Sequence, residues 1–98
     1  MNILRESQRN VLQECLNRYG IEEQQRMAME ECAELIQAIN KIHRKPSQES
    51  MNNLFEEIAD VTIMIEQLKM IYLVDDCSTI ERIVEEKINR QKGRLENH

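Results

Sequence analysis

The sequence has very few residues that interrupt helices, with two glycines and one proline among 98 positions. A multi-strand fold needs turn residues about every ten positions, so this scarcity argues against a β architecture and favours long helices. The length suits one domain and leaves no room for two. We therefore expect residues 1–98 to form a single all-α domain that resembles a four-helix bundle.

Long apolar runs and zinc-type ligand sets are also missing. No stretch approaches the roughly 20 apolar residues of a transmembrane helix, and the N-terminal residues MNILRESQRN lack the apolar core of a signal peptide. His43 and His98 are isolated, and the odd number of cysteines includes no CxxC pair. We expect a cytoplasmic protein without a membrane partner, in which Cys15, Cys32 and Cys77 are small core residues.

Basic charge is scarce, because 13 Lys and Arg residues stand against 18 Asp and Glu residues, for a net charge of −5. With no dense basic run, the chain is not expected to bind a nucleic acid polymer. The acidity is concentrated in residues 22–66, which hold ten acidic and four basic residues. Residues 87–98 have the opposite balance, with four basic residues and one acidic residue.

The few helix-breaking residues predict where the helices end. Gly20 follows a helically spaced apolar set and is typical of a C-cap, and the residue before Pro46 is pushed out of helical geometry. Ser78 stands three residues before Glu81, which predicts a capping box at the start of the last helix. The expected helices span residues 3–19, 22–43, 51–74 and 79–94.

The third predicted helix is apolar on nearly every face. A helix of this kind must be covered nearly all round, and three neighbours of this size are too few. We therefore expect a partner chain to cover it, which favours a homo-oligomer. The main stripe consists of Leu54, Ile58, Val61, Ile65, Leu68 and Tyr72. The apolar residues on the other faces are Phe55, Ala59, Ile63, Met64, Met70 and Leu73.

One acidic pattern occurs twice, as EECAELI at residues 30–36 and EEIADVT at residues 56–62. At 100° per residue, Glu31, Glu34 and Glu30 lie roughly 70°, 130° and 170° from the middle of the apolar face of their helix. The second segment repeats these offsets on the third helix. Each helix thus has an i, i+3 carboxylate pair at the edge of its buried face, and antiparallel packing would bring the two edges together.

Carboxylates gathered at the rim of a core repel one another and lose hydration, so they need a compensating charge. A divalent cation with oxygen ligands supplies it, and Mg²⁺ is the ion that also commonly bridges to substrate phosphates. A single Glu-Glu pair on a helix is usually only a solvated surface. The repeated pattern therefore leaves two interpretations open, a solvated acidic face and a magnesium site.

The sequence also resembles a known protein family, in its two acidic motifs and in the YG…Q run before them, which is formed by Tyr19, Gly20 and Gln24. The runs EExAEL at 30–35 and EExADV at 56–61 resemble the MazG-like all-α nucleoside triphosphate pyrophosphohydrolases, especially the short stand-alone versions of bacteria and phages. This resemblance implies a helical bundle that assembles as a dimer or tetramer in the cytoplasm of a bacterial or phage-infected cell. It also implies hydrolysis of a nucleoside triphosphate between its α- and β-phosphates with Mg²⁺, for which Mn²⁺ can substitute.

The resemblance also assigns roles to individual residues. The positions that match the metal ligands are Glu31, Glu34, Glu57 and Asp60. Glu30 matches the remaining acidic position and is the expected catalytic base, with Glu56 as the second choice. The expected substrate-binding residues are Lys87, Arg90 and Arg94 for the phosphates, and Tyr19 and Gln24 near the nucleoside.

Several alternative functions remain open from the sequence. Within enzymes, the chain could be a relative specific for phosphoribosyl-ATP, dUTP or dCTP. From other classes, it could be a non-catalytic helical interaction module or a nucleotide sensor. The interaction module is disfavoured because no strict a/d heptad is sustained.

Overall fold

The computed structural model describes residues 4–72 and 77–97, and in these residues the only regular secondary structure is helical. This confirms the all-α fold class for the described part of the chain. No described helix is long and apolar enough to cross a membrane. The four helices are α1 (Glu6–Tyr19), α2 (Ile21–Arg44), α3 (Gln48–Ile71) and α4 (Ser78–Glu96).

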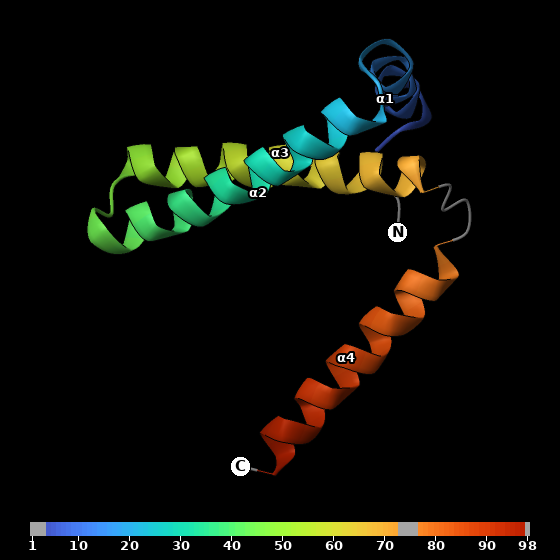
Figure 1. The fold of residues 1–98 in the computed structure, drawn as a ribbon. Helices are drawn as coiled ribbons and strands as arrows, with labels where there is room; N and C mark the ends of the chain where they lie inside the picture. The colour runs from blue at the N-terminus through green and yellow to red at the C-terminus, as the bar shows by residue number, and fades with distance from the viewer. Residues whose placement is uncertain (1–3, 73–76, 98) are drawn as a thin grey trace.

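The two longest helices, α2 and α3, have 24 residues each and form an antiparallel hairpin (Figure 1). α2 ends at Arg44, two residues before Pro46, as the proline predicts. α3 begins three residues earlier than expected, because Ser47 caps it: the Ser47 hydroxyl accepts from the Ser50 N–H (3.0 Å) and the Ser50 hydroxyl accepts from the Ser47 N–H (2.9 Å). This short turn holds the hairpin closed at one end.

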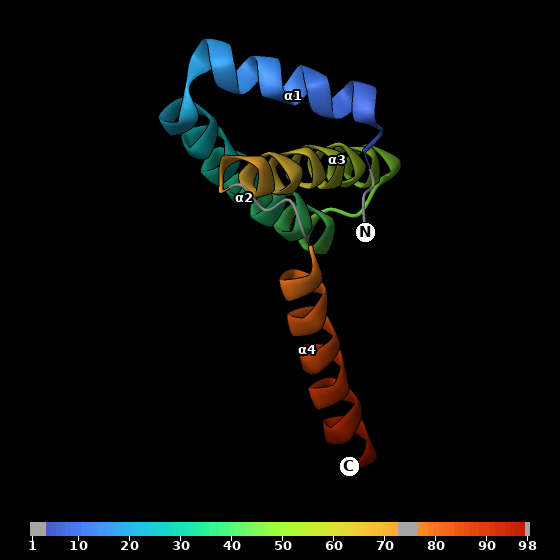
Figure 2. The same cartoon turned by 90° about the vertical axis from the view of Figure 1, so that its right-hand side faces the viewer.

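α1 packs across the hairpin (Figure 2). It ends at Gly20, whose φ of 89° lies in the left-handed region and whose N–H donates to the Leu16 carbonyl (3.0 Å). Gly20 therefore is the predicted C-cap, and α2 starts at the next residue. α1 begins at Glu6, whereas the expected start, residue 3, lies outside the described residues. One hydrogen bond joins α1 to α3: the side-chain amide of Gln67 donates to the Leu12 carbonyl (3.3 Å).

α4 stands apart from the other three helices (Figures 1 and 2). No Cα atom of α4 lies within 8 Å of a Cα atom in α1, α2 or α3. The predicted capping box at Ser78 is wrong, because Cys77 has a near-helical backbone (φ −79°, ψ 3°), occupies the N-cap position and makes no side-chain cap bond. The structure therefore differs from the expected four-helix bundle: three helices pack together, and α4 projects away from them.

The core of the single chain is small and lies between α2 and α3. Among the described residues, Ala28 and Ala38 are the only fully buried apolar ones. Phe55 and Tyr72, which lie on the apolar faces expected to be covered, are 55% and 66% exposed in the single chain. Cys32, an expected core residue, is exposed as well. The reason is that α3 is covered by α2 and α1 only, so its remaining faces meet no other element of the described chain.

Candidate metal centre

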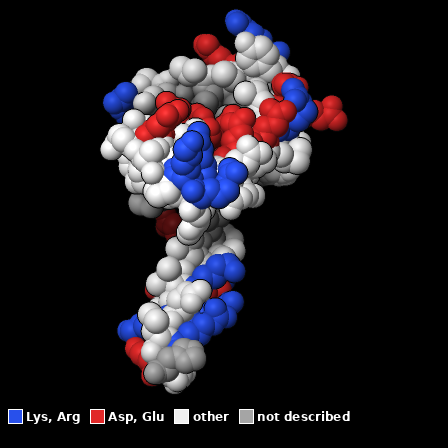
Figure 3. All heavy atoms as spheres, turned by 90° about the vertical axis from the view of Figure 1, so that its left-hand side faces the viewer, with Lys and Arg blue, Asp and Glu red and all other residues white. Residues whose placement is uncertain are grey.

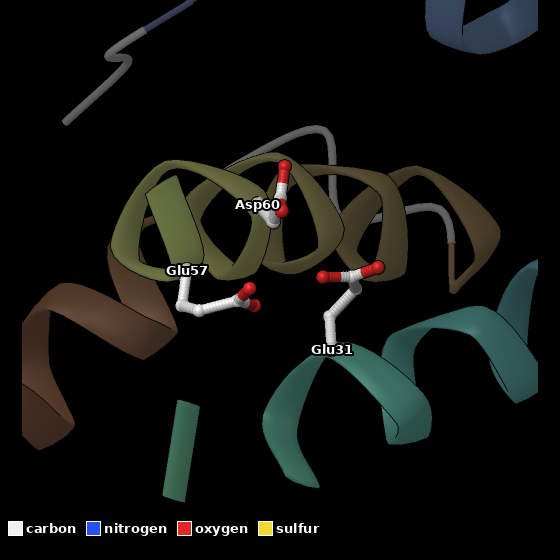
Figure 4. Close-up of side chains that lie close together, drawn as sticks. All are labelled: Glu31, Glu57 and Asp60. Carbon is white, nitrogen blue, oxygen red and sulfur yellow. The ribbon is translucent and has the colours of Figure 1, made fainter. Parts of the chain in front are cut away.

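Three carboxylates from the two hairpin helices converge on one point (Figure 4). Glu57 and Asp60 lie one turn apart on α3, and Glu31 faces them from α2. One oxygen from each side chain lies within 4.8 Å of the others. The small side chain of Ala28, one turn before Glu31 on the buried face of α2, lets the two helix backbones approach closely here.

Burial sets the electrostatics of this cluster. Glu57 is 9% exposed, and one oxygen each of Glu31 and Glu57 is buried without a hydrogen-bond partner. Burial, followed by the charges of Asp60, Glu34 and Glu57, raises the pKa of Glu31 to about 7. Burial and then the charges of Glu34 and Asp60 also raise the pKa of Glu57. The cluster is therefore a site that favours a proton or a cation.

No Lys or Arg of the described chain forms an ion pair with Glu31, Glu57 or Asp60. A proton on one of these carboxylates, or a bound cation, would relieve their repulsion. Glu34, one turn after Glu31, is exposed at the rim, and its charge contributes to the raised pKa values of Glu31 and Glu57. The structure thus places Glu34 close to Glu31, Glu57 and Asp60, and these four are the positions that the resemblance matches to metal ligands.

Glu30, the expected base, lies in a different environment. Its carboxylate accepts from the guanidinium of Arg26 (2.6 Å) in an i, i+4 ion pair on the exposed side of α2, and Arg26 also pairs with Glu23. Both carboxylates raise the pKa of Arg26, Glu23 more than Glu30. Glu56 is exposed. Neither residue is among the three converging carboxylates.

A cavity of about 400 Å³ opens between α1 and the hairpin, one helical turn from the carboxylate cluster. Met27, four residues before Glu31, and Met64, four residues after Asp60, lie on its wall. The sequence-predicted residues Tyr19 and Gln24 also line it. The full lining is Leu12, Cys15, Tyr19, Glu23, Gln24, Met27, Met64 and Gln67.

Gln67 is a cavity residue that the sequence does not reveal, since a Gln within a long helix is usually a surface residue. Its side chain is 2% exposed, its amide nitrogen bonds to Leu12, and its amide oxygen is buried without a partner. The amide of Gln24 is buried in the same cavity wall. The cavity therefore combines apolar walls with two buried amides.

The three basic residues expected near the phosphates, Lys87, Arg90 and Arg94, are exposed on α4. Because α4 packs against no other described helix, the structure of one chain does not bring them to the cluster. Figure 3 shows a band of acidic side chains over the body formed by α1–α3, with a basic patch directly beside it, and both basic and acidic side chains along α4.

Comparison with protein-family models, with curated proteins and with solved structures finds no match for this chain in any of the three.

Proposed function

We propose that this chain is a magnesium-dependent nucleotide pyrophosphohydrolase that cleaves a nucleoside triphosphate between its α- and β-phosphates. The observation that carries the proposal is the convergence of Glu31, Glu57 and Asp60, with two buried carboxylate oxygens that have no partner. Buried carboxylates without a counter-charge are costly, and a divalent cation is the usual compensation. The proposed setting is the cytoplasm, where nucleoside triphosphates and Mg²⁺ occur together.

The donor set fits a hard cation. All the ligand atoms are carboxylate oxygens, which Mg²⁺ and Mn²⁺ prefer, whereas zinc sites use histidine and cysteine. Glu31, Glu57 and Asp60 would hold the ion, and Glu34 at the exposed rim would complete the set. Mg²⁺ usually retains several waters and bridges to phosphate oxygens, so the open side of the cluster suits a triphosphate.

The proposed reaction needs a water molecule in line with the bond between the α-phosphorus and the bridging oxygen. When bound, the ion neutralises phosphate charge and acidifies a coordinated water. The water oxygen bonds to the α-phosphorus, the bond to the bridging oxygen breaks, and pyrophosphate leaves. The water's proton passes to a carboxylate that does not hold the ion. Glu30 is the first candidate, once it exchanges its Arg26 partner, and Glu56 is the second.

The cavity beside the cluster supports a nucleotide as the substrate. Its apolar walls suit a flat base, and the buried amides of Gln24 and Gln67 offer both donors and acceptors. Tyr19 at its edge can stack on a base. A phosphate chain that begins at this cavity reaches the carboxylates within about one helical turn, roughly 5 Å.

The test is a pyrophosphate-release screen with Mg²⁺ over common and modified nucleoside triphosphates, including dUTP, dCTP and phosphoribosyl-ATP. We expect release with at least one of them, lowered at least about 100-fold in Asp60→Asn and Glu57→Gln. The matched control is Glu49→Gln, an exposed position in the first turn of α3, which is expected to retain the parent rate. Folded Asp60→Asn and Glu57→Gln proteins that release pyrophosphate at the parent rate would contradict the proposal.

A second candidate is a non-catalytic helical interaction module or nucleotide sensor, which the uncovered apolar faces of α3 and α4 favour. An interaction module predicts no thermal shift with Mg²⁺ or Mn²⁺, because its carboxylates are merely solvated. A sensor predicts a thermal shift with a nucleotide and Mg²⁺ but no turnover. The same screen, run beside a thermal-shift titration, separates all three functions.

A further inference from the structure

Two buried amides lie two helical turns away from the carboxylate cluster, both in the wall of the cavity beside it. On α2, Gln24 is seven residues before Glu31, and on α3, Gln67 is seven residues after Asp60. Seven residues make almost two full turns, so each amide lies on the same helix face as its carboxylate, roughly 10 Å along the axis. Because α2 and α3 are antiparallel, both amides lie on the same side of the cluster (Figure 1).

Two methionines, Met27 and Met64, occupy the helical turn between the amides and the carboxylates. Their unbranched thioether side chains are flexible and make favourable contacts with aromatic rings, so they can move aside for a ring without a change in the backbone. The cavity wall thus has three successive layers, of carboxylates, methionines and amides. A nucleoside that lies along these layers would place its base against the methionines and the outer edge of the base at the amides.

The amide of Gln67 is held in one orientation. Its nitrogen donates to the Leu12 carbonyl at 3.3 Å. If the amide turned over, its oxygen would face that carbonyl, and two acceptors cannot form a hydrogen bond. The Gln67 Oε1 atom is therefore fixed on the other side of the amide, where it is buried and has no hydrogen-bond partner. A buried acceptor without a partner is costly, so a ligand that donates to it is strongly favoured over one that does not.

The amide of Gln24 is not fixed in the same way. Its nitrogen contacts the sulfur of Met27 at 3.7 Å, and a thioether is only a weak acceptor. Either end of the Gln24 amide can therefore turn toward a ligand without the loss of a strong hydrogen bond, so this residue can donate or accept. Discrimination between bases must then come from Gln67, whose oxygen accepts only.

We propose that Gln67 makes this site select nucleotides whose base carries an exocyclic amino group, as cytosine and adenine do. This selection rests on the proposed function, because the ligand is a nucleotide whose phosphates lie at the carboxylates. The amino group of cytosine projects beyond its ring and donates to the Gln67 Oε1 atom. Uracil has a carbonyl oxygen at the same position, so two acceptors would face each other. Adenine and hypoxanthine differ in the same way, and a site that bonds an N–H rejects the analogue that lacks it.

The test measures binding without turnover, by titration calorimetry with Mg²⁺ and the uncleavable α,β-imido analogues of two nucleotide pairs. One pair is dCTP and dUTP, and the other is ATP and ITP. In at least one pair, the amino-bearing analogue is expected to bind at least about tenfold more tightly than its partner, and the pair that shows this tells cytosine from adenine. Equal affinities within both pairs, tighter binding of the carbonyl-bearing analogues, or no binding of any of the four would overturn the proposal.

Gln67→Met tests whether this residue is the source of the preference, because methionine has a similar length and no oxygen. The ratio of the two affinities is expected to fall to within about twofold in this variant. The control is Gln13→Met, the same change at an exposed position of α1, which is expected to retain the parent ratio. A folded Gln67→Met protein with the parent ratio would overturn the proposal. The nucleotide pairs test the parent protein itself, so the result does not depend on the stability of this variant.

Pyrophosphate release from dCTP, dUTP, ATP and ITP separates this selection from the proposed function. Cleavage with equal kcat/KM within both pairs would leave the hydrolysis standing and overturn the selection by Gln67. If the analogues bind with the expected preference but none of the four triphosphates is cleaved, the proposed hydrolysis is wrong and the selection by Gln67 stands.

Discussion

Two buried carboxylate oxygens, one on Glu31 and one on Glu57, have no hydrogen-bond partner, and the expected response of the protein to protons and cations follows from them. An ordinary Glu has a pKa of 4.5, and burial with neighbouring charges raises that of Glu31 to about 7. Helical spacing predicted that these carboxylates lie at the edge of the buried face, because the position of a residue along a helix determines the direction in which its side chain leaves the axis. It did not predict their degree of burial, because that depends on how closely Ala28 and Ala38 let the helices approach.

The stability of the metal-free protein is expected to fall as pH rises from about 5 to about 8. Between pH 4.5 and about 7 the folded state retains a proton on Glu31 that the unfolded chain has lost, so each rise in pH favours unfolding. Thermal unfolding in a chelator measures this trend. Added Mg²⁺ is expected to raise the melting temperature more at about pH 8 than at about pH 5.5, because the ion competes with the proton. A Mg²⁺ shift that is larger at the lower pH would contradict this assignment.

Glu31→Gln replaces the buried charge with a neutral group of similar shape. We expect the metal-free melting temperature at about pH 8 to rise by about 4 °C, and the shift with Mg²⁺ to disappear. Glu56→Gln, on the exposed side of α3, is the control that is expected to change neither quantity. A metal-free Glu31→Gln protein that melts below the parent would show that this carboxylate stabilises the fold.

At the scale of the helices, the sequence predicted the ends that depend on backbone geometry. Gly20 and Pro46 end helices where expected, because one tolerates a positive φ and the other constrains its neighbour. The start of α3 was placed three residues too late, since Ser47 and Ser50 cap each other without the usual Glu or Gln. The cap at Ser78 was wrong because a matching spacing does not reveal that Cys77 is already near-helical.

Replacing each of the two glycines with alanine is expected to change the unfolding free energy in opposite directions. Gly20 has a φ of 89° and a ψ of 161°, a combination that is essentially restricted to glycine. Because no atom lies within 4 Å of an added Cβ, Gly20→Ala is expected to lose about 1–3 kcal/mol of unfolding free energy through the backbone alone. Gly93 lies inside α4 with the same open surroundings, so Gly93→Ala is expected to gain about 0.5–1 kcal/mol. Urea unfolding of both variants measures the changes. If both variants changed the unfolding free energy in the same direction, the explanation from the backbone conformation of each glycine would be contradicted.

Ser47→Ala removes the side chain that caps α3. The expected loss is about 1 kcal/mol of unfolding free energy, typical of an N-cap whose oxygen accepts a backbone N–H. Gln48→Ala, at the exposed first residue of the same helix, is the control that is expected to change stability by less than about 0.5 kcal/mol. Urea unfolding measures both, and equal losses would show that the cap contributes nothing specific.

For the whole molecule, the sequence predicted that one chain cannot cover its own apolar surface. Residues such as Phe55 and Ile65 indicated this, because they lie on faces of α3 that three neighbours do not reach. It did not predict that α4 would stand apart, since the apolar stripe of α4 from Ile80 to Ile88 is equally compatible with packing on its own α3 or on another chain. An apolar pattern specifies that a surface is to be buried, and leaves open which surface buries it.

The melting temperature of the parent protein is expected to rise with protein concentration, because association stabilises only the folded state. Scanning calorimetry over about a hundredfold range of concentration measures this, with an expected rise of several degrees. Val84→Glu, in the apolar stripe of α4, is expected to remove the dependence, and Asn89→Glu, on the polar side of the same helix, is expected to retain it. A concentration-independent melting temperature in the parent would contradict the expected homo-oligomer.

The single-residue joint at Gly20 has a mechanical consequence. α1 has 14 residues and is therefore a rigid rod about 21 Å long. With no other residue between it and α2, rotation by about 10° at Gly20 swings the far end of α1 by roughly 3.5 Å. The hydrogen bond from the Gln67 amide to the Leu12 carbonyl holds α1 near its middle and restrains this rotation. Because α1 lines one side of the cavity beside the carboxylates, any rotation at Gly20 would change the width of that cavity, and the bond from Gln67 to Leu12 opposes such a rotation.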